Sequence, residues 1–322
     1  MRPKFDWRIY SWPALIACLV LLIANEIANP TFIYQDNWQS VLLAAAPFIL
    51  TALAQTAPVL SGNGGLDLSV GPLAGLVSAV IASTLGRNGI TDPVTTIAVA
   101  LGIGIGSGLI NGILVAVARV QPIIATLGTF LIYQGLTLEV LPTAGGVAPP
   151  WMHILTGSFL GVPGILYLLV LVGVLWLALG MTAYKRNLMA VGGELRAAYT
   201  AGVNVAAVRI LAYVIAGLMG AVAGIVFTAV LNSADPTVGV PYTLTSVAAA
   251  VLGGVSLMGG RGGFLGAAAG GALLFLIQNL FTVAQVSVFY IQVAYGAILL
   301  AALALNALSD HLRRRGMAAI DA

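Results

Sequence analysis

The stretch AVRILAYVIAGLMGAVAGIVFTAVL, residues 207–231, indicates the class of fold, because it is almost wholly apolar along its length. A helix of about 20 apolar residues is long enough to cross the hydrocarbon core of a bilayer. The one charged residue of the stretch, Arg209, lies near its first end. The stretch therefore predicts a transmembrane helix.

Similar apolar stretches fill most of the remaining chain. Only 7% of the 322 residues are charged, whereas a soluble domain has roughly a quarter. The sequence predicts an all-α fold, a polytopic transmembrane helical bundle of about 10 helices that forms one domain over residues 1–322. The third and eighth spans are short, which suggests broken or tilted helices. Besides the first stretch, we expect spans at 12–28, 39–61, 72–86, 94–118, 121–140, 163–182, 243–258, 264–283 and 288–308.

The basic residues indicate how the spans are oriented. With a cytoplasmic N-terminus, ten spans bring the C-terminus back to the cytoplasm and leave only Arg87 of the 13 Lys and Arg residues outside. Nine spans would scatter these charges, so we expect an even number and both termini in the cytoplasm. The basic start resembles a signal peptide, but the many later spans favour an uncleaved first helix. The basic residues form no continuous patch, and nucleic acid is not an expected partner.

One predicted cytoplasmic loop, about 183–208, differs from the others in length and charge. Its centre, GGELRAAYTAG at 192–202, combines helix-forming residues with a closing glycine and predicts a short surface helix. From these residues alone, the loop is either a solvated connector or a contact site for another protein. The candidate contact residues are Gly192, Gly193, Glu194, Arg196, Ala197, Ala198 and Gly202.

Two glycine-rich breaks interrupt the apolar sequence, SGNGGLDLSVGP at 61–72 and GGVSLMGGRGG at 253–263. Glycine clusters end helices or allow close backbone approach, and Asp67 or Ser69 can cap a new helix. Irregular backbone at membrane depth is tolerated only against protein or a wet cavity. We therefore expect Asn63, Asp67, Ser69 and Arg261 at a translocation pathway or its cytoplasmic gate.

Uncharged polar residues within the spans are further candidates for the pathway. Gln55, Thr126, Gln278 and Asn279 are suited to a wet path for an uncharged hydroxylated solute. Hydrogen bonds between neighbouring helices explain the same residues equally well. Charged residues within the spans are few and lie near their ends, which disfavours ion-coupled transport.

No catalytic motif is readable in the chain. A G-x-x-x-x-G-K-[ST] phosphate loop is absent from the sequence, so any ATP that drives this protein is hydrolysed on another chain. His153 and His311 are far apart and Cys18 is the one cysteine, which makes a metal site improbable. We expect no enzyme, and no cofactor or metal on this chain.

Five stretches in order resemble the ribose/xylose/arabinose-type permeases of ATP-binding-cassette (ABC) importers. Together they extend over nearly the whole chain, and their order is more specific than any one of them. They are GGLDLSVG at 64–71, RVQPIIATLG at 119–128, the loop at 190–205, DPTVG at 235–239 and AAAVLGGVSLMGGRG at 248–262.

The resemblance implies a multi-pass permease of the bacterial inner membrane that imports a monosaccharide or related polyol by alternating access. It implies three kinds of partner: a second permease copy or a paralogous permease, a periplasmic solute-binding protein, and cytoplasmic ABC ATPase subunits that hold ATP and magnesium. Residues 190–205 would then be the coupling helix that contacts the ATPase. The chain departs from the family at Leu195 and Arg196, where many relatives have Glu-Ala-Ala, and at Thr243–Thr245, where an acidic residue is common.

Two other functions remain open at this point, and a third, a membrane enzyme, is not expected. A permease for branched-chain amino acids should need charged or helix-end partners for the solute, and the few charges within the spans weigh against it. A stand-alone channel or facilitator would need no ATPase and would transport passively in liposomes. A membrane enzyme would require a polar catalytic cluster that the sequence does not reveal.

Overall fold

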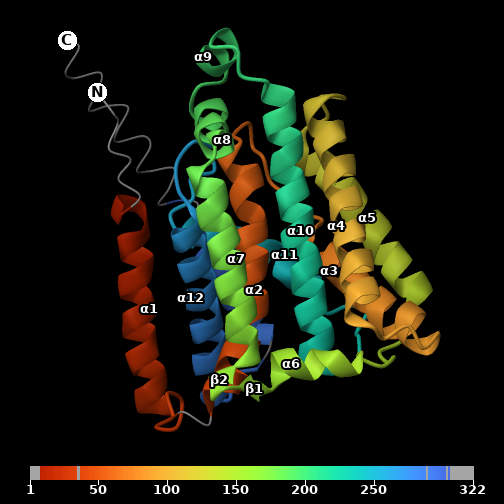
Figure 1. Cartoon of the computed structure of the whole chain (residues 1–322). Coiled ribbons are helices and arrows are strands. Elements are labelled where there is room, and N and C mark those ends of the chain that lie inside the picture. Colours follow the sequence, from red (N-terminus) through yellow and green to blue (C-terminus); the bar gives the residue numbers. More distant parts are fainter. Residues whose placement is uncertain (1–7, 35–36, 288, 302–303, 305–322) are drawn as a thin grey trace.

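The chain folds into a bundle of helices whose long axes run in roughly the same direction (Figure 1). The structure is a computed structural model that describes residues 8–34, 37–287, 289–301 and 304. A short 3-10 turn (Pro150–Met152) precedes α6, and a two-stranded antiparallel hairpin, β1 (Ser158–Phe159) and β2 (Val162–Pro163), follows it. The α-helices are α1 (Arg8–Ala28), α2 (Trp38–Leu60), α3 (Val70–Ala79), α4 (Pro93–Ala116), α5 (Pro122–Val140), α6 (His153–Thr156), α7 (Gly164–Met181), α8 (Ala183–Gly193), α9 (Leu195–Thr200), α10 (Val205–Leu231), α11 (Tyr242–Leu252) and α12 (Phe264–Val283).

The predicted spans are found as apolar helices. Seven of them are long and apolar enough to cross a membrane, namely α2, α4, α5, α7, α10, α12 and the part of α1 from Ser11. Three shorter apolar helices lie at Val70–Leu85, Tyr242–Leu252 and Phe289–Ala301. The last predicted span, 288–308, extends beyond the described residues.

Two of the predicted spans differ in detail from the helices observed. The third changes from α-helix to π-helix at Val80 and ends at Leu85. The eighth was expected to reach residue 258, but α11 ends at Leu252, because Gly253 and Gly254 begin an irregular segment. Gly254 has a φ of 83°, a conformation that other residues rarely adopt. The prediction for residues 253–258 was therefore wrong, and α11 is a half-length helix.

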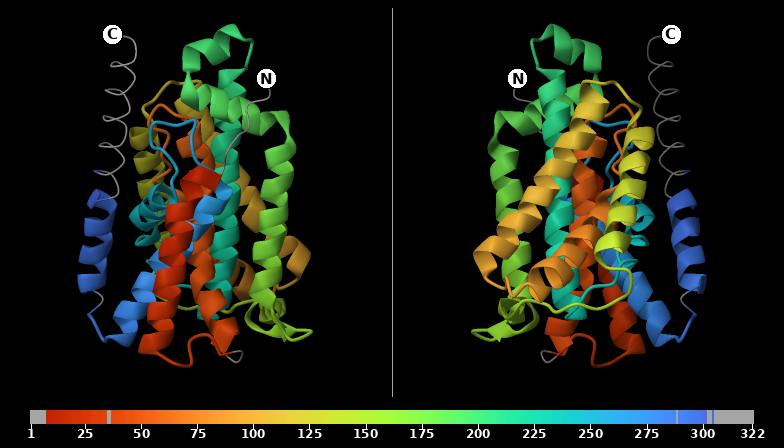
Figure 2. Two further views of the ribbon diagram at one scale, coloured as in Figure 1. Left: turned by 90° about the vertical axis from the view of Figure 1, so that its left-hand side faces the viewer. Right: turned by 90° about the vertical axis from the view of Figure 1, so that its right-hand side faces the viewer.

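The centre of the bundle is formed by α2 and α10, which pack against each other and against most other helices (Figures 1 and 2). Leu50 and Leu53 of α2 and Ala212 and Phe227 of α10 belong to one buried cluster. The outward faces of the peripheral helices are apolar, as at Leu19 of α1, which is 60% exposed. An apolar exterior around a buried core is expected of a protein surrounded by lipid.

Glycines bring α4 and α10 into backbone contact. A Cβ atom on Gly104 would lie 2.5 Å from the carbonyl oxygen of Gly217, and one on Gly217 would overlap with the carbonyl oxygen of Gly104. Small residues at these positions allow the two helices to pack closely. Gly102 and Gly106 of the same helix would meet nothing within 4 Å, and they take no part in this packing.

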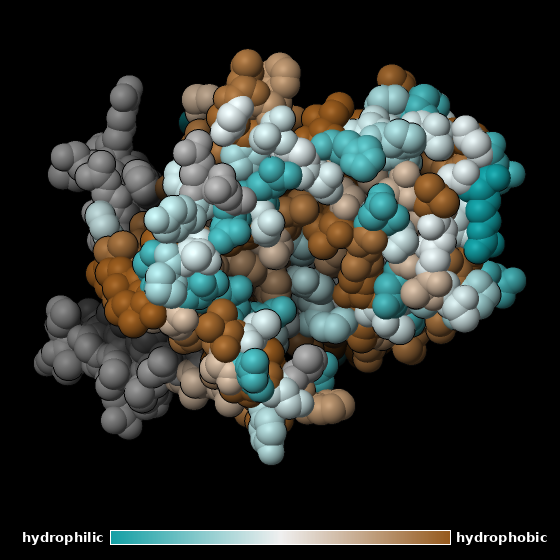
Figure 3. All heavy atoms as spheres, turned by 90° about the horizontal axis from the view of Figure 1, so that it is seen from below, coloured by the Kyte–Doolittle hydropathy of each residue, from teal (hydrophilic) through white to brown (hydrophobic). Residues whose placement is uncertain are grey.

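Successive long helices run in opposite directions, so the segments that connect them lie at two opposite ends of the bundle. α8, α9 and the start of α10 lie at one end, and α6 with the hairpin lies at the other (Figure 1). Hydrophilic and hydrophobic residues are mixed on the end that carries α6 (Figure 3). The alternation agrees with the charge pattern, and the assignment of the α8–α9 end to the cytoplasm stays a prediction.

Candidate functional site

The first glycine-rich break, residues 61–69, folds back along the end of α2. Nε2 of Gln55 donates a hydrogen bond to the carbonyl oxygen of Asp67 (2.6 Å), and the Asp67 amide donates to Oε1 of Gln55 (3.2 Å). Nε2 of Gln55 also donates to Oγ of Ser246 on α11 (3.1 Å). All three residues are buried. One side chain thus satisfies the buried backbone of the break and joins it to two helices.

The Asp67 carboxylate is the centre of a buried polar cluster. Its Oδ1 accepts hydrogen bonds from the Ser69 amide (3.0 Å), the Ser69 hydroxyl (2.6 Å) and Nδ2 of Asn111 on α4 (3.3 Å). Nδ2 of Asn111 also donates to Oγ of Ser69 (2.9 Å), and Oγ1 of Thr129 on α5 donates to Oδ1 of Asn111 (2.8 Å). We call Gln55, Asp67, Ser69, Asn111 and Thr129 the Asp67 cluster. It holds the break against α2, α4 and α5.

The expected helix cap at the start of α3 is formed in a specific way. Of the two residues expected as a possible cap, Asp67 and Ser69, it is Ser69 that occupies the N-cap position, and its side chain makes no capping hydrogen bond. Its hydroxyl points instead to Asp67, whose carboxylate accepts the Ser69 amide. Burial raises the pKa of Asp67 above its usual range, and the hydrogen bonds from Ser69 and Asn111 offset part of this effect.

The two breaks and the end of α8 meet at a second place, made almost entirely of backbone. The Gly260 amide donates to the carbonyl oxygen of Leu60 (3.0 Å). A Cβ on Gly192 would overlap with that oxygen and lie 2.5 Å from the Gly260 nitrogen. A Cβ on Gly62 would lie 2.9 Å from Cα of Gly192. We call Gly62, Gly192, Gly259 and Gly260 the glycine junction.

Beyond the glycine junction, α9 projects from the bundle (Figure 1). Glu194 is the N-cap of α9, and its Oε1 accepts the Arg196 amide (3.3 Å). Gly202 ends α9 in a left-handed conformation, with a φ of 81°. Its amide donates a hydrogen bond to the carbonyl oxygen of Tyr199, and the Val203 amide donates one to the carbonyl oxygen of Ala198. This is a Schellman motif, which confirms the predicted surface helix with a glycine stop.

The α8–α9 segment contains the predicted contact residues, most of which are accessible. Gly193, Glu194, Arg196, Ala197 and Gly202 are exposed, Gly192 is half-buried and Ala198 is buried. Two large apolar residues of α9 that were not among the predicted contact residues, Leu195 and Tyr199, are 40% and 73% exposed. Exposed apolar side chains on a projecting helix are typical of a protein contact.

The remaining pathway candidates are distributed over the bundle rather than gathered. Thr126 lies beside the Asp67 cluster, since its hydroxyl donates to the carbonyl oxygens of Pro122 (2.8 Å) and Leu66 (3.4 Å). Asn63 and Arg261 are exposed in the two breaks. The other two lie on α12: Gln278 accepts the Tyr295 hydroxyl (2.8 Å), and Asn279 donates to Asn25 of α1 (2.9 Å).

Asn111 and Ser246, two polar residues that complete the contacts of the first break, were not among the predicted site residues. Both are almost fully buried. Asn111 follows a run of alternating glycines in an otherwise apolar span, and a buried amide in such a span is a signal that could have been used. Ser246 offered no such signal, because serine is common at helix contacts.

These observations define a multi-pass membrane protein with a buried polar cluster, two irregular segments between its apolar helices and a short helix that projects at one end. Comparison with known proteins then identifies its class. Residues 37–303 match the family described as "Branched-chain amino acid transport system / permease component", and the chain belongs to this family.

Curated relatives match over most of their own length. A ribose import permease protein of Bacillus subtilis is 36% identical over 310 residues, which cover 95% of each chain. An autoinducer 2 import system permease protein of Escherichia coli O157:H7 is 33% identical, covering 94% of this chain and 90% of the relative. A galactofuranose transporter permease protein of Escherichia coli K12 is 36% identical over 81% and 78% of the two chains. No solved structure shows significant similarity. The expected resemblance to sugar permeases is confirmed.

Proposed function

We propose that this chain is the membrane subunit of an ABC importer that moves a monosaccharide or related polyol into a bacterial cell. One or two separate ATPase chains, which bind ATP and magnesium, would drive it from the cytoplasm. A second permease copy or a paralogous permease would complete the transmembrane pathway, and a periplasmic binding protein would deliver the solute. The complex would lie in the inner membrane.

The observation that carries the proposal is the glycine junction between the end of α8, which leads into α9, and the two breaks. Gly192, at the end of α8, touches the backbone on both sides, at Leu60 and Gly260. Because these backbone atoms are in direct contact, Gly192 cannot move toward Leu60 or Gly260 without displacing them, since closely packed protein transmits displacement rather than absorbing it. A partner that moves α9 would therefore also move both breaks, which is the property a permease needs in order to use an external motor.

The uncharged solute is inferred from the polar groups inside the bundle and from the relatives. Oδ1 of Asp67, the acidic residue of the Asp67 cluster, already accepts three hydrogen bonds from within the chain. A zwitterionic amino acid would need charged or helix-end partners in the pathway. The name of the family keeps branched-chain amino acids as a second candidate. Three relatives are named for ribose, autoinducer 2 and galactofuranose.

Reconstitution into liposomes tests the proposal. The chain is purified with a candidate ABC ATPase and a candidate solute-binding protein of the same organism, and uptake of radiolabelled D-ribose, D-galactose and L-leucine is measured with and without ATP. We expect ATP-dependent accumulation of a sugar and none of leucine. Passive sugar uptake by this chain alone would replace the proposal with a facilitator, and ATP-dependent leucine uptake would replace the solute class.

A further inference from the structure

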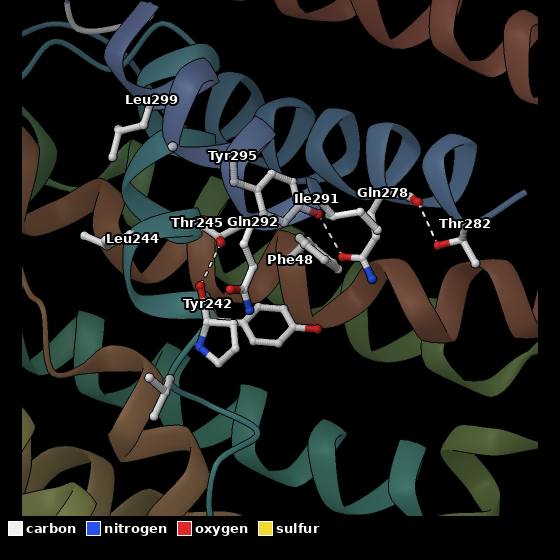
Figure 4. A pocket seen from close by; sticks show the side chains of 13 residues that line it. Phe48, Tyr242, Leu244, Thr245, Gln278, Thr282, Ile291, Gln292, Tyr295 and Leu299 are labelled. Carbon is white, nitrogen blue, oxygen red and sulfur yellow. Dashed lines mark hydrogen bonds between the residues drawn. The ribbon is translucent and has the colours of Figure 1, made fainter. Parts of the chain in front are cut away.

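A cavity of about 530 Å³ lies between α2, α11, α12 and the helix Phe289–Ala301 (Figure 4). Sites for small molecules usually have volumes of about 300–1,000 Å³ and apolar walls with a few polar groups. The cavity is separate from the Asp67 cluster, none of whose residues lines it. Nothing in the proposed coupling mechanism uses it.

Aromatic rings form one wall of the cavity. Phe48 of α2 and Tyr242 of α11 have ring centroids 4.9 Å apart and planes tilted by 58°. Tyr242 is also in contact with Phe227 of α10, at a centroid distance of 4.9 Å. The Tyr242 ring is therefore held from two sides. Its position leaves a rigid aromatic surface for the apolar CH groups of a solute.

Two amide side chains face this wall from different helices. Figure 4 shows Gln278 of α12 and Gln292 of the last described helix around the same space as Phe48 and Tyr242. The Tyr295 hydroxyl donates to Oε1 of Gln278 (2.8 Å) and so fixes the orientation of this amide. Among the described residues, neither the Gln292 amide nor the Tyr242 hydroxyl has a hydrogen-bond partner. Both are available to a solute, as donors and as acceptors.

The cavity offers no site for a charged solute. None of the described residues that line it is acidic or basic. The N-terminus of α11 borders the cavity, but its first two backbone amides already have acceptors within the chain. The Tyr242 amide donates to the carbonyl oxygen of Gly239 (3.0 Å), and the Thr243 amide donates to the carbonyl oxygen of Val240 (3.2 Å). The preceding residue, Pro241, has no amide hydrogen. A carboxylate or an ammonium group would be left unpaired here, which is costly at membrane depth.

We propose that this cavity binds a neutral, polyhydroxylated ring, a pyranose or furanose, during its passage through the permease. The ring lies with its apolar face against Tyr242 and Phe48. Its hydroxyl groups exchange hydrogen bonds with the amides of Gln278 and Gln292 and with the Tyr242 hydroxyl. The assignment rests on the proposed function, since it locates the solute of that function within the chain.

A cysteine reporter tests whether the cavity is wet and whether it binds a sugar. Cys18, the one cysteine of the chain, is first replaced by alanine. Leu244→Cys places a thiol at a cavity-lining position that is 59% exposed and outside the proposed contacts. Val174→Cys is the matched control, 54% exposed on α7 and remote from the cavity lining. Both variants are placed in proteoliposomes and treated with a membrane-impermeant sulfonate thiol reagent.

We expect the reagent to modify Leu244→Cys and to spare Val174→Cys. D-ribose or D-galactose should slow the modification, and L-leucine should not. Adding Tyr242→Phe, which keeps the ring, should raise the sugar concentration for half-maximal protection about fivefold, the usual effect of losing one neutral hydrogen bond. Tyr290→Phe, at an exposed position outside the cavity, should leave it unchanged.

Two results would overturn the assignment. A Leu244→Cys thiol as unreactive as Val174→Cys would mean that lipid fills the cavity. A reactive thiol that neither sugar protects would mean that the cavity is wet but does not bind the solute. Either result leaves the proposed function standing if the complete importer still accumulates sugar. Protection without ATP-dependent uptake would instead contradict the proposed function and retain the binding site.

Discussion

The glycine junction and the Asp67 cluster lie at opposite ends of one short break, yet they are built in different ways. The junction is backbone against backbone, and at Gly192 even a methyl group would overlap with a neighbouring carbonyl oxygen. The cluster is a network of side-chain hydrogen bonds to Asp67. The first arrangement transmits position by contact, and the second holds a defined shape. A segment with one of each at its ends can move as a unit when the junction is displaced.

The largest expected effect comes from filling the junction. Gly192→Ala places a Cβ onto the carbonyl oxygen of Leu60, and nothing nearby can give way except backbone. We expect loss of sugar uptake in the reconstituted importer, with an overpacking penalty of about 1–3 kcal/mol or more. Gly135→Ala in α5 is the control, since its Cβ would also meet nothing within 4 Å and it belongs to neither the junction nor the predicted contact residues. Equal uptake by the two variants would show that the junction is not a tight contact.

Removing the centre of the Asp67 cluster should have a smaller effect, on stability. Asp67→Ala leaves the amide and the hydroxyl of Ser69 without their acceptor, so we expect a loss of about 1–3 kcal/mol. The raised pKa of Asp67 means that ionisation is less favourable in the folded protein than in the unfolded chain, so stability falls as pH rises through the range where Asp67 ionises.

The neutral variant Asp67→Asn separates these two contributions. It keeps an Oδ1 acceptor and carries no charge, so we expect a melting temperature in detergent at or above that of the natural chain. Its melting temperature should also depend less on pH. If Asp67→Asn destabilised the protein as much as Asp67→Ala, the charge itself would be required in the cluster.

Changes on the exposed surface of α9 should leave both the junction and the cluster intact and weaken only the contact with a partner. Combining Glu194→Lys with Arg196→Glu should reduce ATPase affinity about tenfold, a difference of about 1.4 kcal/mol. Glu194→Gln is the control, because it keeps the acceptor for the Arg196 amide. The measurement is the yield of ATPase that copurifies at increasing salt. An unchanged yield would remove residues 190–205 from the interface.

The smallest effect is expected at the glycines of α4. A Cβ atom at Gly106 would meet nothing within 4 Å, so Gly106→Ala should stabilise α4 by about 0.5–1 kcal/mol. Gly104→Ala should do the opposite, because its Cβ would clash with Gly217. Thermal unfolding of the two variants under the same conditions checks the sign. Destabilisation by Gly106→Ala would mean that another chain packs against this face.

The sequence predicted the helices and both breaks well, because apolar length and glycine clusters act locally. It did not predict that Gly62 and Gly260 lie beside Gly192, since the contact joins segments distant in the chain and involves no side chain. Asn111 was missed for a related reason: its partners, Asp67 and Thr129, come from other elements. Asn279 was a pathway candidate, yet it bonds Asn25 across two helices. The presence of a polar residue within a span did not reveal which neighbouring residue it would bond.

The most direct test of the account asks which side of the membrane α9 faces and what covers it. Arg196→Cys is made in the Cys18→Ala background, and labelling by an impermeant thiol reagent is compared in inside-out and right-side-out vesicles. The account predicts labelling only from the cytoplasmic side, and protection when the ATPase subunit is added. Labelling from the outside, or labelling that the ATPase does not reduce, would contradict it.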